Sequence, residues 1–248
     1  MHFNASFLRR ALLMAGIMVA MFQGTAAADG GISLSRTRVV FQSTDNAQTL
    51  TMQNHGSRPY LVQSAVVATP GGRESTPFIT TPPLFRLEAN SKNTIRILRK
   101  GNVELPSDRE SVFYFTAIAV PAMAPPKETD ELSQTSRMSV GIQNTIKLFY
   151  RPTGLAMVPE EAEGRLTFYQ QGGKVRVHNP TPYYLTFSRL AFDGTEYNVR
   201  DNVSMIAPFS QIDYPVSGHV RQAQWSVIND YGGTSQQYQS AVLTGEKS

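Results

Sequence analysis

The chain has 248 residues and no cysteine, so small disulfide-linked scaffolds are excluded and stability must come from buried hydrophobic cores. Its formal net charge is +4, carried by 23 basic and 19 acidic residues. Because the basic residues form no cluster, the charge does not indicate a nucleic-acid partner.

Residues 1–28 have the pattern of a secretory signal peptide. Two arginines precede the apolar run Ala11–Phe22, and three alanines end the segment. The run is shorter than the roughly 20 apolar residues of a membrane-spanning helix, and no later segment comes close. We therefore expect a mature chain that begins at Asp29, is exported and is not embedded in a membrane.

After this segment, apolar residues recur with period two in short runs rich in β-branched and aromatic residues, which predicts β-strands. The first seven predicted strands are Ile32–Phe41, Gln48–Asn54, Tyr60–Val67, Phe85–Leu87, Lys92–Leu98, Ser111–Ile118 and Arg137–Tyr150. Their number and spacing are typical of an immunoglobulin-like sandwich of two antiparallel sheets.

Two segments interrupt this series. Thr80–Pro83 contains two prolines, and Pro121–Thr135 is rich in proline and acidic residues. Proline cannot donate a hydrogen bond to a strand ladder, so neither segment fits a central strand. The second segment predicts a long loop, and long loops are uncommon unless they are functional or disordered.

A second series of seven strands follows: Leu166–Gln170, Lys174–His178, Tyr183–Ala191, Val203–Ile206, Gln211–Tyr214, Gln224–Ile228 and Gln237–Val242. Between the two series, Arg151–Gly154 contains a proline that ends a strand and a glycine that permits a turn. We expect an all-β chain of two immunoglobulin-like sandwich domains, 29–151 and 152–248. The short link predicts a defined angle and a cleft between them.

The sequence contains no recognisable catalytic motif. The mature histidines, His55, His178 and His219, are isolated, and no nucleophile elbow, phosphate-binding glycine loop or CxxC pair is present. We therefore expect no enzymatic activity, no metal and no cofactor.

One strand, Arg137–Tyr150, has two interpretations. Alternation places a mainly apolar row on one face: Met138, Val140, Ile142, Asn144 and Ile146. The simpler interpretation is a last sandwich strand whose apolar side joins its own core. In the other, Lys147, which interrupts the apolar run Ile146–Tyr150, indicates a binding role, because such a lysine must snorkel, pair with an acid or face a cleft.

Six motifs occur in order along nearly all of the mature chain: Ser35–Phe41, Thr81–Leu87, Asp108–Tyr114, Lys147–Pro152, Asn179–Tyr184 and Ile228–Gly233. Together they resemble the periplasmic pilus chaperones of the chaperone-usher pathway, the PapD-like family. The resemblance implies two sandwich domains in an L shape. It also implies a periplasmic chaperone that binds pilus or fimbrial subunits (pilins) by donor-strand complementation and delivers them to an outer-membrane usher.

The resemblance also implies roles for particular residues. The donor strand for the subunit is residues 137–150, with Met138, Val140 and Ile142 as its subunit contacts. Arg38 and Lys147 match the family's pair that binds the C-terminal carboxylate of the subunit in the interdomain cleft. Arg36, two residues before Arg38 on the same face, is the alternative to it.

Glu110, Arg151 and Asp230 match the family's internal salt-bridge group near the domain junction. Their alternative interpretation is three independent surface charges. The loop Pro121–Thr135 is longer than in the short-loop members of the family, but the chain lacks the cysteine pair that is usual in the long-loop members. We favour the short-loop type. Leu132 would lie on the same face of an extended strand as Met138, so it could extend the face of the donor strand that contacts the subunit.

Competing functions are a secreted immunoglobulin-like adhesin or carbohydrate-binding module, and a hydrolase or metal-dependent enzyme for which the sequence offers no site. Whether the free chaperone caps its own edge by forming a homodimer stays open.

Overall fold

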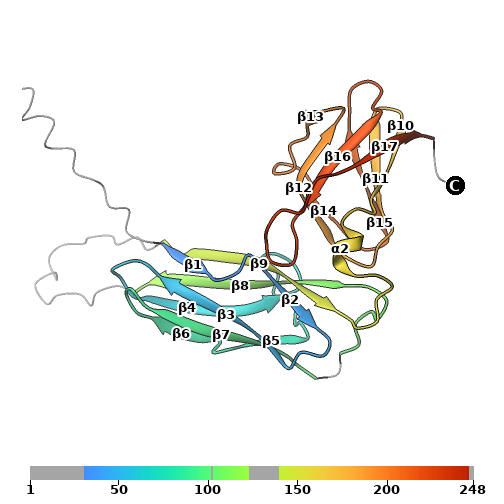
Figure 1. The fold of residues 1–248 in the computed structure, drawn as a ribbon. Coiled ribbons are helices and arrows are strands. Elements are labelled where there is room, and N and C mark those ends of the chain that lie inside the picture. Colours follow the sequence, from blue (N-terminus) through green and yellow to red (C-terminus); the bar gives the residue numbers. More distant parts are fainter. Residues whose placement is uncertain (1–30, 102, 123–139, 246–248) are drawn as a thin grey trace, which may run out of the picture.

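A computed structural model describes residues 31–101, 103–122 and 140–245. Figure 1 shows two β-sandwiches that meet in an L shape, which confirms the predicted fold class. The predicted signal peptide, Met138, Leu132 and most of the predicted long loop lie outside the described residues. Within those residues, the helix α2 (Pro159–Ala162) is a single turn, and no helix has the length and hydropathy to cross a membrane.

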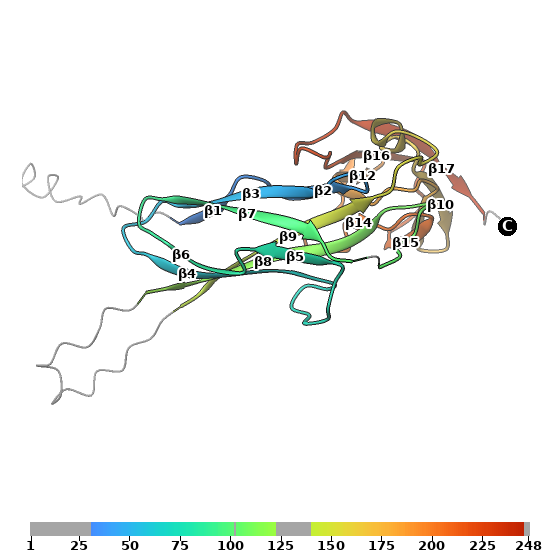
Figure 2. The same ribbon diagram turned by 90° about the horizontal axis from the view of Figure 1, so that it is seen from below.

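The first sandwich consists of two sheets. One has the strand order β1 (Ile32–Leu34), β3 (Ala47–Asn54), β7 (Lys92–Arg99) and β5 (Phe78–Thr81). The other has the order β2 (Arg38–Gln42), β9 (Ile142–Arg151), β8 (Ser111–Pro121), β4 (Tyr60–Val67) and β6 (Leu84–Leu87). Figure 2 shows the two layers, with β3 and β7 in one and β4 and β8 in the other. Alternate residues of both sheets, such as Leu50, Ile95 and Phe115, are fully buried between them.

The first predicted strand, Ile32–Phe41, is wrong as a single element. It is two strands in different sheets, because the chain leaves the ladder at Ser35 and crosses the sandwich. β1 pairs antiparallel with β3, whereas β2 pairs parallel with β9. The core-facing residues are Ile32 and Leu34 in β1 but Val39 and Phe41 in β2, so the alternation shifts by one residue between Leu34 and Val39, and a single strand over this range ignores that shift.

Strand β5 (Phe78–Thr81) is absent from the predicted strands, because its last two residues belong to the predicted proline-rich interruption Thr80–Pro83. Within the described residues it lies at the edge of its sheet, paired with β7 alone, and it ends directly before Pro82. Proline is tolerated at such an edge. β8 also runs to Pro121, three residues beyond its predicted end at Ile118.

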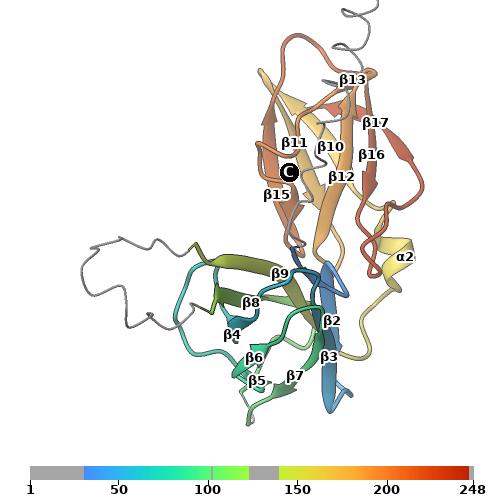
Figure 3. The same ribbon diagram turned by 90° about the vertical axis from the view of Figure 1, so that its left-hand side faces the viewer.

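The second sandwich contains the remaining strands: β10 (Thr167–Gln171), β11 (Lys174–Asn179), β12 (Leu185–Phe192), β13 (Thr195–Glu196), β14 (Met205–Ile206), β15 (Ser210–Pro215), β16 (Gln222–Val227) and β17 (Tyr238–Thr244). β17 pairs antiparallel with β16 and parallel with β10, so it links the two layers seen in Figure 3. The core is built around Trp225, whose ring centroid lies 4.8 Å from that of Phe168.

Candidate functional site

Strand β9 presents two different faces near the domain junction. Leu148 and Tyr150 are buried in the core of the first sandwich, with Ile146 packed against them. The intervening residues Lys147 and Phe149 face the second sandwich, since side chains alternate along a strand. The Phe149 ring centroid lies 5.8 Å from that of Tyr184 in the second sandwich. One strand therefore joins a core to an interdomain contact.

The first half of β9 is an open sheet edge. β8 pairs with β9 from Ile142 to Tyr150, but β2 pairs with it only from Lys147 to Arg151. Within the described residues, positions 142–146 thus have a strand neighbour on one side only. An unpaired edge is a template for strand addition by another chain. The edge exists because β2 begins at Arg38, after the chain has crossed between the sheets.

An apolar row runs along this open edge and emerges from the core into solvent. Leu148 is fully buried, Ile146 and Ile142 are half-buried, and Val140 is 70% exposed. Within the row, the side-chain amide nitrogen of Asn144 is buried and has no hydrogen-bond partner in the described chain. The row is an extension of the core with nothing in the described structure to cover its outer end.

Arg38 and Lys147 lie side by side where the open edge ends. They are directly opposite each other in the β2–β9 ladder. Lys147 Nζ donates a hydrogen bond to Thr186 Oγ1 at 3.2 Å, and Arg38 Nη1 donates one to the Ile228 carbonyl oxygen at 2.8 Å. Both acceptors are neutral and both belong to the second sandwich. Arg36, in contrast, is exposed and donates to Gln48 Oε1 at 3.3 Å.

The two cations are held in an unfavourable environment. Burial, together with the charge of Arg38, lowers the pKa of Lys147 to about 8. Burial also lowers the pKa of Arg38, although Asp230 and Glu110 act in the opposite direction. The Arg38 Nε atom is buried and has no partner in the described chain. A carboxylate placed between these groups would neutralise charge and accept their free hydrogen bonds.

A cleft of about 470 Å³ opens beside Arg38, between β2 and the loop of the second sandwich that carries Asp230 and Tyr231. The cleft therefore has walls from both domains, and both Arg36 and Arg38 line it, whereas Lys147 does not.

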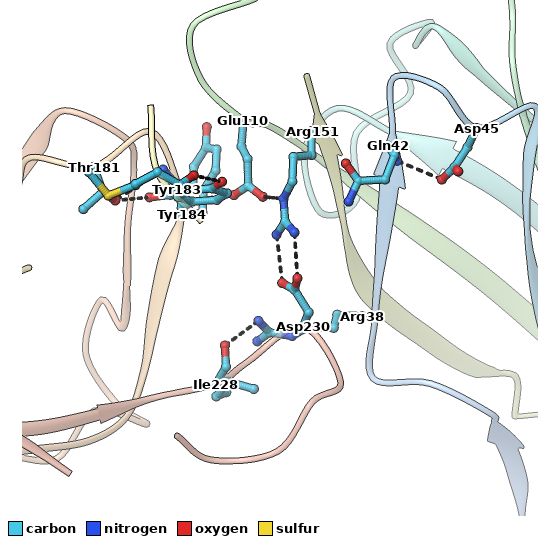
Figure 4. A network of polar contacts seen from close by, with 11 residues as sticks. Arg38, Gln42, Asp45, Glu110, Arg151, Thr181, Tyr183, Tyr184, Ile228 and Asp230 are labelled. Carbon is cyan, nitrogen blue, oxygen red and sulfur yellow. Dashed lines mark hydrogen bonds and ion pairs between the residues drawn. The ribbon is translucent and has the colours of Figure 1, made fainter. Parts of the chain in front are cut away.

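Glu110, Arg151 and Asp230 are brought together at the junction (Figure 4). Arg151 Nε donates to Glu110 Oε1 at 2.8 Å, and its two Nη atoms donate to the Asp230 carboxylate at 2.7 and 2.8 Å. The second Glu110 oxygen accepts from the Tyr184 backbone N–H at 2.9 Å. The Glu110 side chain is 1% exposed and that of Arg151 9%. The three charges form one network, which crosses from one sandwich to the other.

The charges in this network perturb one another. Burial raises the pKa of Glu110, whereas Arg151 and the Tyr184 N–H lower it. Burial acts to lower the pKa of Arg151, but the hydrogen bonds and charges of Asp230 and Glu110 outweigh it, so the pKa of Arg151 is raised. Arg151 stays charged and supplies the positive centre that two carboxylates share.

A tight loop positions Asp230. The Asn229 side-chain oxygen accepts hydrogen bonds from the backbone N–H groups of Tyr231 and Gly233. Gly232 has a φ of +84°, and a Cβ atom there would lie 2.2 Å from Thr37 Oγ1. Only glycine allows this loop to approach the first sandwich so closely. The sequence motif Ile228–Gly233 contains this signal, whereas nothing in the sequence indicated the contact of Thr186 with Lys147.

Within the residues that the structure describes, no group of three or more His, Asp or Glu side chains is arranged to hold a metal ion.

Comparisons with known proteins agree with this architecture. The family model "Pili and flagellar-assembly chaperone, PapD N-terminal domain" matches residues 31–156, and "Pili assembly chaperone PapD, C-terminal domain" matches residues 161–239. The probable fimbrial chaperone YadV of Escherichia coli K12 is 36% identical over 86% of this chain and 89% of its own. The chaperone FimB/FhaD of Bordetella pertussis is 34% identical over 94% of this chain and 98% of its own.

Two solved structures are similar in both sequence and fold. The E. coli chaperone DraB gives a TM-score of 0.72 at 35% identity, over 86% of this chain and 97% of its own. The SafB chaperone, solved in complex with the SafA pilin of Salmonella enterica, gives a TM-score of 0.75 at 31% identity, over 88% of this chain and 99% of its own. The chain therefore belongs to the PapD family of pili assembly chaperones.

Proposed function

We propose that this chain is a periplasmic chaperone that binds pilus or fimbrial subunits by donor-strand complementation and delivers them to an outer-membrane usher. The observation that carries the proposal is the open edge of β9, which ends at two partly buried cations. The solved complex of SafB with a pilin supports it, because that chaperone is similar over nearly its whole length. The alternative of a secreted adhesin or carbohydrate-binding module has no such support.

In this proposal, the subunit adds a strand to the open edge at residues 142–146. Backbone hydrogen bonds provide affinity that tolerates different sequences, and alternate side chains enter the groove of the subunit. Of the three predicted subunit contacts, Val140 and Ile142 lie in the described part of the chain, and Met138 is proposed to continue the row. Each fully buried side chain contributes about 1.5–3 kcal/mol before the cost of ordering is subtracted.

Arg38 and Lys147 are proposed to bind the C-terminal carboxylate of the subunit. Binding relieves the repulsion between the two cations and gives the buried Arg38 Nε an acceptor. Because the chain end of the subunit is then anchored, the register of the added strand is fixed as well.

Glu110, Arg151 and Asp230 are proposed to set the angle between the domains without touching the subunit. Residues 1–28 are proposed to be the export signal, with the domain boundary between Arg151 and Pro152. No enzymatic step and no cofactor are needed, because strand exchange involves only non-covalent contacts.

The test is recovery of a pilin with the tagged chaperone from the periplasm. Lys147→Ala and Arg38→Ala should fold normally but lose the subunit, whereas the matched control Arg36→Ala should retain it. Unchanged recovery with both cleft variants would contradict the proposal. Loss with Arg36→Ala instead of Arg38→Ala would reassign the carboxylate site.

A second comparison tests the face of β9. Val140→Asp should weaken recovery more than Gln143→Asp, because only Val140 belongs to the apolar row and Gln143 is exposed on the opposite face. Equal effects of the two variants would refute the assignment of the apolar row as the face of the donor strand that contacts the subunit.

A further inference from the structure

A further interdomain contact lies beside the salt-bridge network and involves a cation on an aromatic ring. The Arg109 guanidinium carbon, in the segment before β8, lies 4.8 Å from the ring centroid of Phe209, in the segment before β15. Asp108 holds the guanidinium in place, since Arg109 Nε and Nη2 donate to its carboxylate at 3.0 and 2.7 Å. A distance below about 6 Å gives a favourable cation–π contact.

The backbone at Phe209 is unusual for a bulky residue. Its φ is +52°, in the left-handed region that glycine and asparagine adopt with much less strain. The side chain is 45% exposed and is not part of the hydrophobic core of the second sandwich. Core packing therefore does not account for an aromatic residue here, and the contact with Arg109 does.

The contact belongs to a continuous strip across the junction. The Phe209 N–H donates to the Thr181 carbonyl at 3.2 Å, and the Glu110 N–H, next to Arg109, donates to the Pro182 carbonyl at 2.9 Å. This strip is thus an attachment of the second sandwich in addition to the loop of Asp230 and to the contacts of Lys147 with Thr186 and of Phe149 with Tyr184. Attachments that are separated from one another resist rotation more than a single contact, which would act as a hinge.

The angle of the second sandwich matters because acceptors on this sandwich orient two cations of the first sandwich, Arg38 and Lys147. Lys147 is oriented by Thr186, and Arg38 by the carbonyl of Ile228. A rotation of the second sandwich would displace both acceptors at once, and Arg38 and Lys147 would then no longer be held in the orientation that binds the carboxylate of the subunit.

We propose that Arg109 and Phe209 form an interdomain clamp that fixes the angle between the sandwiches and so positions Arg38 and Lys147 for the subunit. This inference rests on the proposed function for its consequence, but not for its geometry. Both are positioning residues, and neither needs to touch the subunit.

The test measures the interdomain angle directly. Because the chain has no natural cysteine, Thr49→Cys and Gln239→Cys, one exposed site in each sandwich, accept spin labels specifically. Phe209→Leu and Arg109→Met should broaden the distance distribution between the labels in the free protein. Both should also speed pilin dissociation by about two- to fivefold, the factor that corresponds to one exposed cation–π contact.

Three controls define the outcomes. Phe209→Tyr should keep the wild-type distribution, and the double variant should be no broader than either single variant, because both act through one contact. Additive effects, or faster dissociation with an unchanged distribution, would overturn the clamp. Val140→Asp, on the exposed end of the open edge, should weaken pilin binding without broadening. A wild-type chain that captures no pilin would refute the proposed function instead, and the distance measurement would still test the clamp.

Discussion

The depressed pKa of Lys147 predicts that subunit binding weakens above neutral pH. Lysine normally titrates near 10.5, but burial and Arg38 lower the pKa of this group to about 8 in the free protein. A carboxylate bound beside it raises that pKa again, because it favours the charged form. The contribution of Lys147 to binding is therefore complete well below pH 8, and it is lost progressively as the pH rises from about 8 toward the higher pKa of the complex.

The size of the effect follows from the fraction of Lys147 that carries a proton. With a pKa of about 8, that fraction falls from about nine-tenths at pH 7 to about one-tenth at pH 9. If only the protonated form of Lys147 binds the carboxylate, the affinity for the subunit falls about tenfold between pH 7 and pH 9, which corresponds to about 1.4 kcal/mol of binding free energy. The carboxylate itself stays ionised throughout this range, so it contributes no pH dependence of its own.

A peptide that matches the last strand of a pilin provides the assay, with its binding followed by fluorescence anisotropy from pH 7 to pH 9. Lys147→Arg is the matched control, because arginine stays charged and should give a flat profile. The same peptide with a C-terminal amide should bind weakly at every pH. A wild-type profile as flat as that of Lys147→Arg would refute the reasoning about the cleft.

Three further predictions concern the junction and the open edge. Arg151→Met leaves the buried Glu110 without its cation, so it should lower the free energy of unfolding in urea by about 3–5 kcal/mol. Adding Glu110→Gln should recover part of that loss, and no recovery would argue against the pairing of Arg151 with Glu110. Gly232→Ala should lower the free energy of unfolding by more than about 1 kcal/mol and weaken subunit recovery, because its Cβ would lie 2.2 Å from Thr37 and its φ is positive. Gly233→Ala is the control and should destabilise the protein less, because the nearest neighbour of its Cβ would lie at 3.5 Å. Asn144→Leu removes a buried amide nitrogen that has no hydrogen-bond partner in the described chain, so it should raise the free energy of unfolding of the free protein in urea by about 1–3 kcal/mol. A destabilised variant would show that the amide is hydrogen-bonded in solution.

The predicted strands were confirmed most clearly where the period-two pattern is long. Ser111–Ile118, for example, lies within β8, and Lys92–Leu98 lies within β7. The main error occurred where the chain changes its strand partner. Ile32–Phe41 was predicted as one strand, although its core-facing positions shift from Ile32 and Leu34 to Val39 and Phe41 where the chain crosses between the sheets.

The candidate site was predictable only in part. The motifs indicated Arg38, Lys147 and the salt-bridge residues, but those indications came from a resemblance and not from periodicity. Thr186, which orients Lys147, and Phe209, which contacts Arg109, carried no signal, because each depends on a neighbour in the other domain.

The sequence by itself determined the class of the fold, the two series of strands and the face of each strand that is apolar, since these depend on local alternation and turn residues. Only the tertiary structure decided which strands are neighbours. It placed β2 beside the last five residues of β9 and left the preceding five with an open edge. It also joined Arg151 to Glu110, 41 positions before it, and to Asp230, 79 positions after it. Alternation fixes the side of a strand on which a residue lies, whereas its neighbours depend on how distant segments pack together.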